Sequence, residues 1–125
     1  MNTETRLNNG IEALYAVGHW LVEQGQYRDA AAILRTMVQL APTDERGWLA
    51  LGVCHEQVEQ PEVALEMYGT GSALCASSAR CQLARARLLR AAGQDDDSAE
   101  AYEAAAAAAT HDDELLELIE REQVA

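Results

Sequence analysis

A 34-residue repeat runs through the chain, and this period restricts the folds open to it more than any other feature. The segment from Leu14 is matched by the segment from Trp48 and, more loosely, by a third segment one period further on. The fifth position of each segment is small: Gly18, Gly52 and Ala86. A unit of this length is one supersecondary element, and several stacked copies share a continuous core.

Turn signals divide each copy into two helices of about fourteen residues. Gly25 and Gly93 stand where helices should end, because glycine adopts the left-handed conformation at little cost. Pro61 stands where a helix should begin. The small residues allow the two helices of a copy to pack closely in antiparallel fashion. The sequence predicts helices over residues 11–24, 27–40, 45–58, 61–74, 78–92 and 95–109.

A seventh helix is predicted from Glu114 to about Gln123. Thr110 and Asp113 have the spacing of a capping box in front of it. Its apolar residues are Leu115, Leu116, Leu118 and Ile119. Because the open end of a repeat stack exposes apolar surface, we expect this helix to seal it.

The repeat resembles the tetratricopeptide pattern, W-x-x-L-G-x-x-Y followed by A-x-x-x-F and P, over residues 11–112. The resemblance implies an all-α fold with three helix-turn-helix repeats in a right-handed superhelix and a C-terminal capping helix. The predicted divisions are a short polar N-terminal segment (1–10), three repeats (11–44, 45–78 and 79–110) and the capping helix (111–125).

The net charge of the chain limits the classes of partner that it can bind. The 125 residues include 21 acids against 9 arginines and no lysine, for a net charge of −12. Such a chain repels phosphate backbones and anionic lipids, so we expect no nucleic-acid partner. No apolar stretch approaches the roughly 20 residues that span a bilayer, which predicts no stable membrane insertion and a cytoplasmic location. The partner is therefore sought among proteins.

Nothing in the sequence indicates catalysis. The three histidines are scattered along the chain without a shared metal-binding spacing, and neither a nucleophile motif nor a glycine-rich phosphate loop is present. The cysteines are odd in number and match no metal-binding spacing, which predicts buried, reduced thiols: Cys54, Cys75 and Cys81. We expect no enzyme activity, no metal and no cofactor.

One face of each first helix is not needed by the core. Its second, fifth, ninth and twelfth positions point away from the signature residues and should line a concave groove. Tyr15, Leu49 and Leu83 form an apolar row there at the 34-residue spacing. An exposed apolar stripe usually marks a partner site. Alternatively, the curvature of the stack or the last helix covers much of it.

The third copy is basic. Residues 77–92 contain four arginines and no acid, and three of these arginines share the groove face: Arg80, Arg87 and Arg90. They either bind a carboxylate of a partner or pair with acids on the adjacent helix. Those acids are Asp95, Asp96, Asp97 and Glu100.

Two stretches point to a narrower family. Residues 14–30 begin with Leu-Tyr and close with Gly-x-Tyr-x-x-Ala, and residues 51–71 contain Leu-Gly-x-Cys followed by Ala-x-x-x-Tyr-x-x-Gly. These motifs resemble the SycD/LcrH-like chaperones of type III secretion translocators. The resemblance implies a bacterial, cytoplasmic chaperone that holds a hydrophobic translocator subunit by an extended segment in the groove before export. Members usually have a longer N-terminal helical segment that takes part in dimerisation, so a homodimer stays open here.

Nine groove residues make up the predicted partner-binding site. The resemblance implies the three on the first helix, and helical geometry gives the others: Tyr15, His19, Val22, Leu49, Val53, Leu83, Arg80, Arg87 and Arg90. Three other functions stay open. They are a chaperone of the secretion needle subunit, a general protein interaction scaffold that uses the convex surface, and a partner of a transcription activator.

Overall fold

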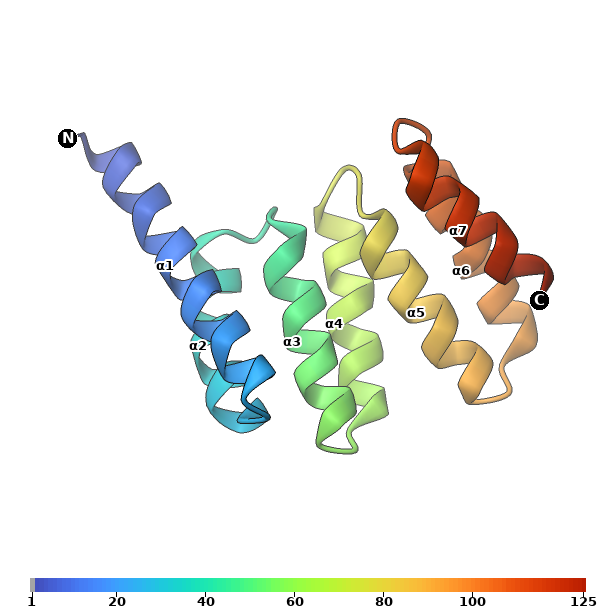
Figure 1. The fold of residues 1–125 in the computed structure, drawn as a ribbon, viewed down its shortest axis with the longest axis horizontal. Helices are drawn as coiled ribbons and strands as arrows, with labels where there is room; N and C mark the ends of the chain where they lie inside the picture. Colours follow the sequence, from blue (N-terminus) through green and yellow to red (C-terminus); the bar gives the residue numbers. More distant parts are fainter. Residues whose placement is uncertain (1) are drawn as a thin grey trace.

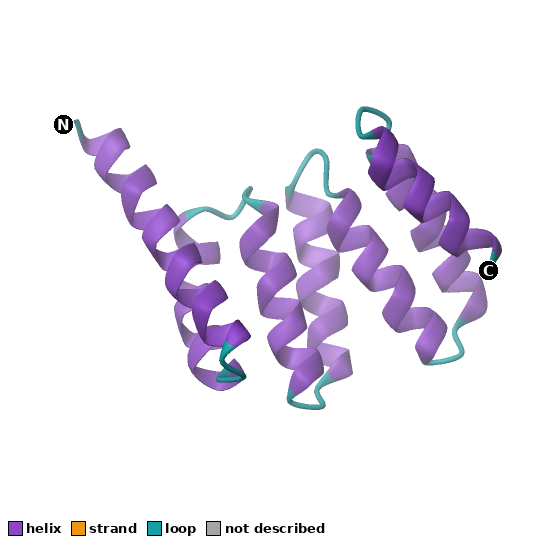
Figure 2. Cartoon of the chain, in the orientation of Figure 1, coloured by secondary structure: helices purple, strands orange, loops and turns teal. Residues whose placement is uncertain are grey.

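The computed structural model describes residues 2–125, which form seven helices joined by short turns (Figure 1). They are α1 (Thr3–Glu23), α2 (Tyr27–Leu40), α3 (Glu45–Gln57), α4 (Pro61–Leu74), α5 (Ala79–Ala91), α6 (Asp95–Ala108) and α7 (Asp113–Val124). Helices α1, α3, α5 and α7 lie side by side in a front layer, with α2, α4 and α6 behind them. Within this part of the chain there is no strand (Figure 2).

The 34-residue repeat located the helices well. The bounds of α2 and α4 are as predicted, those of α3 and α6 differ by one residue at the C-terminal end, and those of α5 and α7 differ by one residue at each end. The prediction was wrong for α1, which begins at Thr3 instead of residue 11. Asn2 caps this helix, because its side-chain oxygen accepts a hydrogen bond from the backbone N–H of Thr5 at 2.7 Å. The expected polar segment therefore extends α1.

The turns at the ends of the first helices share one backbone conformation. Gly25 and Gly93 have φ values of 75° and 78°, as expected for glycines that end helices. Glu59 occupies the equivalent place, one repeat length from each, and has a φ of 61°. Since a side chain is disfavoured in this left-handed region, the repeat geometry holds Glu59 in a strained conformation.

The predicted cap of α7 was wrong by two residues. Asp112, not Thr110, is the N-cap, and its carboxylate accepts a hydrogen bond from the N–H of Leu115 at 3.1 Å. A carboxylate at this position also interacts favourably with the positive end of the helix dipole. The competing pattern in the sequence had the right spacing but lay too early in the chain.

The small repeat positions lie at close helix approaches, as predicted. A Cβ atom at Gly18 would lie 2.8 Å from Cδ2 of Leu34, and a Cβ atom at Gly52 would overlap the ring of Tyr68. Tyr68 itself is fully buried. The second helix of each of these repeats therefore packs its large side chain directly onto the backbone of the first.

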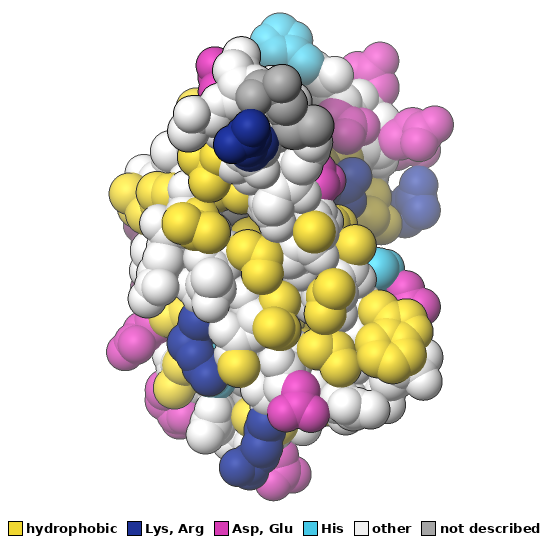
Figure 3. Space-filling view, turned by 90° about the vertical axis from the view of Figure 1, so that its left-hand side faces the viewer, with side chains coloured by type: hydrophobic (Ala, Val, Ile, Leu, Met, Phe, Trp, Pro, Cys, Tyr) yellow, Lys and Arg dark blue, Asp and Glu magenta, His cyan; other side chains and the backbone are white. Residues whose placement is uncertain are grey.

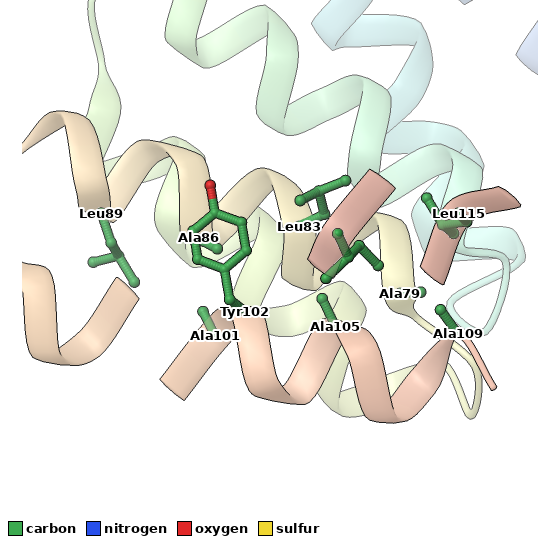
Figure 4. Close-up of a cluster of buried hydrophobic side chains, with 10 residues drawn as sticks. Ala79, Leu83, Ala86, Leu89, Ala101, Tyr102, Ala105, Ala109 and Leu115 are labelled. Atoms are coloured by element: carbon green, nitrogen blue, oxygen red, sulfur yellow. The ribbon is translucent and has the colours of Figure 1, made fainter. Parts of the chain in front are cut away.

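Two apolar clusters form the core. One joins α1, α2 and α3 around Leu34, Met37 and Leu51. The other joins α5, α6 and α7, and Figure 4 shows it around Tyr102 and Leu83. In the described chain no helix is both long and apolar enough to cross a membrane.

Candidate partner-binding site

A hollow of about 340 Å³ lies between α3 and α5, and we call it the groove pocket. Three helices line it through Leu49, Val53, Glu56, Tyr68, Arg80, Leu83, Ala84 and Arg87. Five of these belong to the predicted site: Leu49, Val53, Leu83, Arg80 and Arg87. The helical spacing thus brought together the predicted residues of α3 and two of the three arginines of α5.

The apolar wall of the pocket comes from both helices. Leu49 and Val53 lie one turn apart on α3 and are half-buried. Leu83 faces them from α5 but is only 4% exposed, because it belongs to the C-terminal core with Ile119 of α7. The expectation that the core has no use for Leu83 was therefore wrong. The last helix covers this end of the apolar stripe, and Leu83 forms an inner wall.

A polar pair lies deeper in the pocket. The hydroxyl of Tyr68 donates a hydrogen bond to the carboxylate of Glu56. Burial and this neighbouring carboxylate raise the pKa of Tyr68, so its hydroxyl stays a neutral donor. The ring of Tyr68 packs directly over Gly52. A side chain at residue 52 would prevent this contact. Sequence reasoning missed Tyr68 because its repeat position indicates a core residue.

Two of the three groove arginines are held by α7. Arg87 donates to the carboxylate of Glu122 at 2.6 and 2.9 Å, and this hydrogen bonding lowers the pKa of Glu122. Arg90 donates to the backbone carbonyl of Glu122 at 2.8 Å, and its guanidinium lies 4.4 Å from the ring centre of Tyr102. The last carbonyls of a helix have no partner within it and carry its negative dipole end, which favours a cation there.

Of the two alternatives for the arginines, pairing with the acids of the adjacent helix is not what the structure shows. In residues 2–125, the α6 acids Asp95, Asp96, Asp97 and Glu100 form no ion pair with Arg80, Arg87 or Arg90. The α7 helix takes up Arg87 and Arg90 instead. Arg80 is exposed, and in the described chain its guanidinium forms no ion pair within 4 Å.

The equivalent place between α1 and α3 is filled. Arg46 lies 4.5 Å from the ring centre of Tyr15 and forms ion pairs with Glu12 at 2.6 Å and Asp44 at 2.8 Å. Hydrogen bonds from Arg46 lower the pKa of both carboxylates. We call this group the Arg46 cluster. Tyr15, predicted as a groove aromatic, is half-buried beneath it and does not line the groove pocket.

The other two predicted residues of α1 also lie outside the pocket. His19 stacks on Tyr15 with ring centres 5.8 Å apart and contacts Glu23 at 2.7 Å. Val22 is half-buried and packs against the N-terminal core. The structure thus separates the nine predicted residues into three on α1, five around the groove pocket, and Arg90 at the end of α5.

The thiols are buried, as predicted. Cys54, Cys75 and Cys81 are all free, and burial raises the pKa of each, to about 12 for Cys81. Such thiols are poor nucleophiles. Across residues 2–125, no group of three or more histidine, cysteine or acidic side chains is arranged to hold a metal ion.

An apolar face closes the N-terminal end of the stack. Figure 3 shows hydrophobic side chains gathered along α1 on this end. The large exposed residues of α1 are Leu7, Val17 and Trp20, and Trp20 is 56% exposed. Scattered exposed apolar residues are common, but several along one helix indicate a contact surface.

Comparisons with known proteins agree with this architecture. A tetratricopeptide-repeat family model matches residues 21–74. A search of curated proteins gives no match. Among solved structures, PcrH of Pseudomonas aeruginosa in complex with the chaperone-binding region of PopD is 24% identical, covers 94% of this chain and 90% of its own, and has a TM-score of 0.81. The type III secretion translocator chaperone SycD of Yersinia enterocolitica is also 24% identical, with coverages of 89% and 83% and a TM-score of 0.79. A second SycD structure, described as an alternative dimer, is 21% identical, with coverages of 92% and 95% and a TM-score of 0.75.

The fold of residues 2–125 is thus a stack of three tetratricopeptide-like helix-turn-helix repeats, with α7 packed on the last of them as the capping helix. More narrowly, the chain has the fold of the translocator chaperone SycD and of PcrH, in agreement with the resemblance of the motifs in its first two repeats.

Proposed function

We propose that this protein is a cytoplasmic chaperone of a bacterial type III secretion system, which holds a hydrophobic translocator subunit by an extended segment until export. The observation that carries the proposal is the groove pocket. It offers an apolar wall on the groove side of the repeats, in a chain with the fold of PcrH, and PcrH is solved with the chaperone-binding region of PopD.

The pocket has the size and chemistry to take one apolar side chain of such a segment. Leu49, Val53 and Leu83 surround a space of about 340 Å³. Burying one leucine-sized side chain is worth about 1.5–3 kcal/mol. Ordering the segment offsets part of this gain, so we expect moderate affinity. A moderate affinity lets the export machinery remove the client without ATP use by the chaperone.

The polar residues of the pocket can partner the main chain of the segment. An extended backbone presents N–H and C=O groups that need hydrogen-bond partners when water is excluded. Glu56 has acceptor oxygens, Arg80 has donors, and both residues line the pocket beside the apolar wall. This arrangement favours an extended client over a folded surface, and it separates the proposal from a scaffold that binds through its convex side.

Co-expression tests the proposal directly. The chain is produced with each protein from its own secretion gene cluster that has one or two membrane-length apolar segments. We expect at least one of these proteins to be soluble and to co-purify only when the chaperone is present. Leu49→Asp should abolish this effect, because it puts a charge on the apolar wall.

Leu74→Asp is the matched control. Leu74 is an exposed leucine at the end of α4 and does not line the groove pocket, so this variant should keep the client soluble. A client that is equally soluble with wild-type and Leu49→Asp chains, or with no chaperone, would remove the groove from the account. Loss of binding in the Leu74→Asp chain alone would point to the rear layer of helices.

A second copy of the chain is the proposed occupant of the apolar end face on α1, in keeping with the dimer described for SycD. Trp20→Glu should shift a concentration-dependent dimer to monomer in sedimentation equilibrium. A wild-type chain that is monomeric at all accessible concentrations contradicts this assignment and leaves the groove proposal intact.

A further inference from the structure

Arg80 occupies a distinctive place on the groove face. It lines the groove pocket on one side and two further hollows, of about 240 and 280 Å³, on the other. Its side chain is exposed. The residue therefore lies at the mouth of the apolar pocket, at the point where the space between α3 and α5 meets the space between α5 and α7.

A comparison with Arg46, its equivalent in the preceding repeat, shows why Arg80 is available. Arg46 is held by the carboxylates of Glu12 and Asp44. The residues at the same two places relative to Arg80 are Arg46 and Ser78, and neither has a carboxylate. The hydroxyl of Ser78 is turned away, donating to the backbone carbonyl of Ser72 at 3.2 Å. Arg80 thus occupies the repeat position of Arg46 but lacks both of the carboxylates that hold Arg46.

The acids around Arg80 do not replace them. Glu45, Asp112 and Glu114 line the two outer hollows, but none forms an ion pair with Arg80 in residues 2–125. Glu45 is half-buried against the start of α5, where its carboxylate accepts a hydrogen bond from the N–H of Cys81 at 3.3 Å. Burial, the larger effect, raises the pKa of Glu45, although the charge of Arg80 attracts this carboxylate without forming an ion pair. Within the groove pocket the other cation is Arg87, which Glu122 already binds.

We propose that Arg80 is a specificity residue that binds the carboxylate of an aspartate or glutamate in the client, next to the apolar side chain that enters the groove pocket. This inference rests on the proposed function and names a feature of its client. A guanidinium binds a carboxylate through two parallel hydrogen bonds, which fixes the register of an extended segment. In a chain of net charge −12, a free cation at the pocket also favours acidic segments there that the rest of the surface repels.

Selection from a phage-displayed library of random twelve-residue peptides tests the inference before any client is identified. The targets are the wild-type chain, Arg80→Glu, and Arg28→Glu as a control with the same charge change. Arg28 is an exposed residue of α2, in the rear layer, and lies outside the groove pocket. A fourth target, Leu49→Asp, reports whether the selected peptides use the pocket at all.

We expect wild-type and Arg28→Glu chains to select peptides with an acidic residue one or two positions from Leu, Ile, Val or Met. Arg80→Glu should select lysine or arginine at that position instead. A consensus peptide made with Asp changed to Asn should bind wild type about tenfold more weakly, the scale of a partly exposed charged hydrogen-bonded pair. The same change should alter binding to Arg80→Ala by less than about twofold.

The possible failures are distinct. Apolar peptides that depend on Leu49 but show no acidic preference, or the same preference with Arg80→Glu, overturn the role of Arg80 and leave the proposed function standing. Peptides that bind Leu49→Asp as well as wild type, or no selected peptide at all, overturn both.

Discussion

The groove face of this protein contains two equivalent contacts between neighbouring first helices, one between α1 and α3 and one between α3 and α5. We call them seams, and they differ in whether side chains occupy the space between the helices. Between α1 and α3, the ring of Tyr15 lies under Arg46, which Glu12 and Asp44 hold in place. Between α3 and α5, Leu49 stands at the place of Tyr15 and Val53 at the place of His19, and there is a hollow of about 340 Å³. The same repeat position thus stabilises the stack in one seam and is available for a partner in the next.

The difference has a simple physical origin. A tyrosine ring covers the stem of an arginine and fills space that a leucine at the equivalent place leaves empty. The ion pair between Arg46 and Glu12 joins α3 to α1, whereas Arg80 has no such partner in residues 2–125. In a repeat protein of this kind, one interface between repeats can therefore stabilise the fold while the next one binds a partner, although the backbone has the same repeating geometry at both.

The largest expected difference between the seams, in client affinity and in unfolding free energy, comes from the same substitution made at equivalent positions in both. Ala84→Phe puts a ring into the groove pocket and should lower client affinity by about 10- to 100-fold, because the ring excludes one apolar client side chain. The stability of the chain should change little. Ala50→Phe puts the same ring into the filled seam. Because Ala50 already packs against the N-terminal core, this variant should lose about 1–3 kcal/mol of unfolding free energy. Isothermal titration and urea unfolding of both variants measure the pair; equal losses of affinity would mean that the seams are not distinct.

Truncating the two arginines should produce the next largest difference. Arg46→Ala removes two ion pairs and a cation–π contact and should cost about 1–2 kcal/mol of unfolding free energy. Arg80→Ala removes no ion pair that the described chain contains and should change the same quantity by less than about 0.5 kcal/mol. Chemical denaturation at low salt measures both. A larger loss for Arg80→Ala would show that this residue has a structural role.

The turn at Glu59 lies outside both seams, and a substitution there should change the stability of the chain but not its affinity for the client. Glu59 has a φ of 61°, at the place where Gly25 and Gly93 stand in the other repeats. Glu59→Gly should raise the unfolding free energy by about 0.5–1 kcal/mol, because relief of the left-handed strain exceeds the extra freedom that glycine has in the unfolded chain. Client affinity should not change. A destabilised Glu59→Gly chain would indicate that the glutamate makes contacts worth more than its backbone strain.

The smallest expected effect is a dependence of stability on pH. Hydrogen bonds from arginine lower the pKa values of Glu12, Asp44 and Glu122 below their ordinary range near 4. These groups stabilise the fold above that range, and the contribution is lost as the pH falls through their lowered values. The urea midpoint should therefore fall between pH 6 and pH 3, and Arg46→Ala should show a smaller fall. Identical slopes for the two chains would contradict the assignment to the Arg46 cluster.

The sequence predicts the fold more completely than the site. The bounds of α2 to α6 follow to within one residue from the 34-residue period and its turn residues, because both are local signals. The start of α1 does not, since residues before the first copy have no equivalent elsewhere in the chain. Asn2 caps the helix well before the point that the repeat indicates.

For the site, the helical period places Leu49, Val53 and Arg80 on one face, but it cannot show which seam is open. That depends on side chains in different repeats, such as Glu12 and Arg46, and on the way α7 takes up Arg87. Such pairings involve long-range geometry that no single-sequence pattern contains. The burial of Leu83 beneath α7 has the same origin.

The central claim is that the seam between α3 and α5 holds an apolar segment of a secreted subunit. Its most direct test is quantitative mass spectrometry of proteins that co-purify with tagged wild-type, Ala84→Phe and Glu59→Gly chains from the source cells under secretion-inducing conditions. The account predicts one dominant partner with one or two membrane-length apolar segments, retained by wild type and Glu59→Gly and lost from Ala84→Phe. A partner without such segments, or one that the Ala84→Phe chain retains in full, would contradict it.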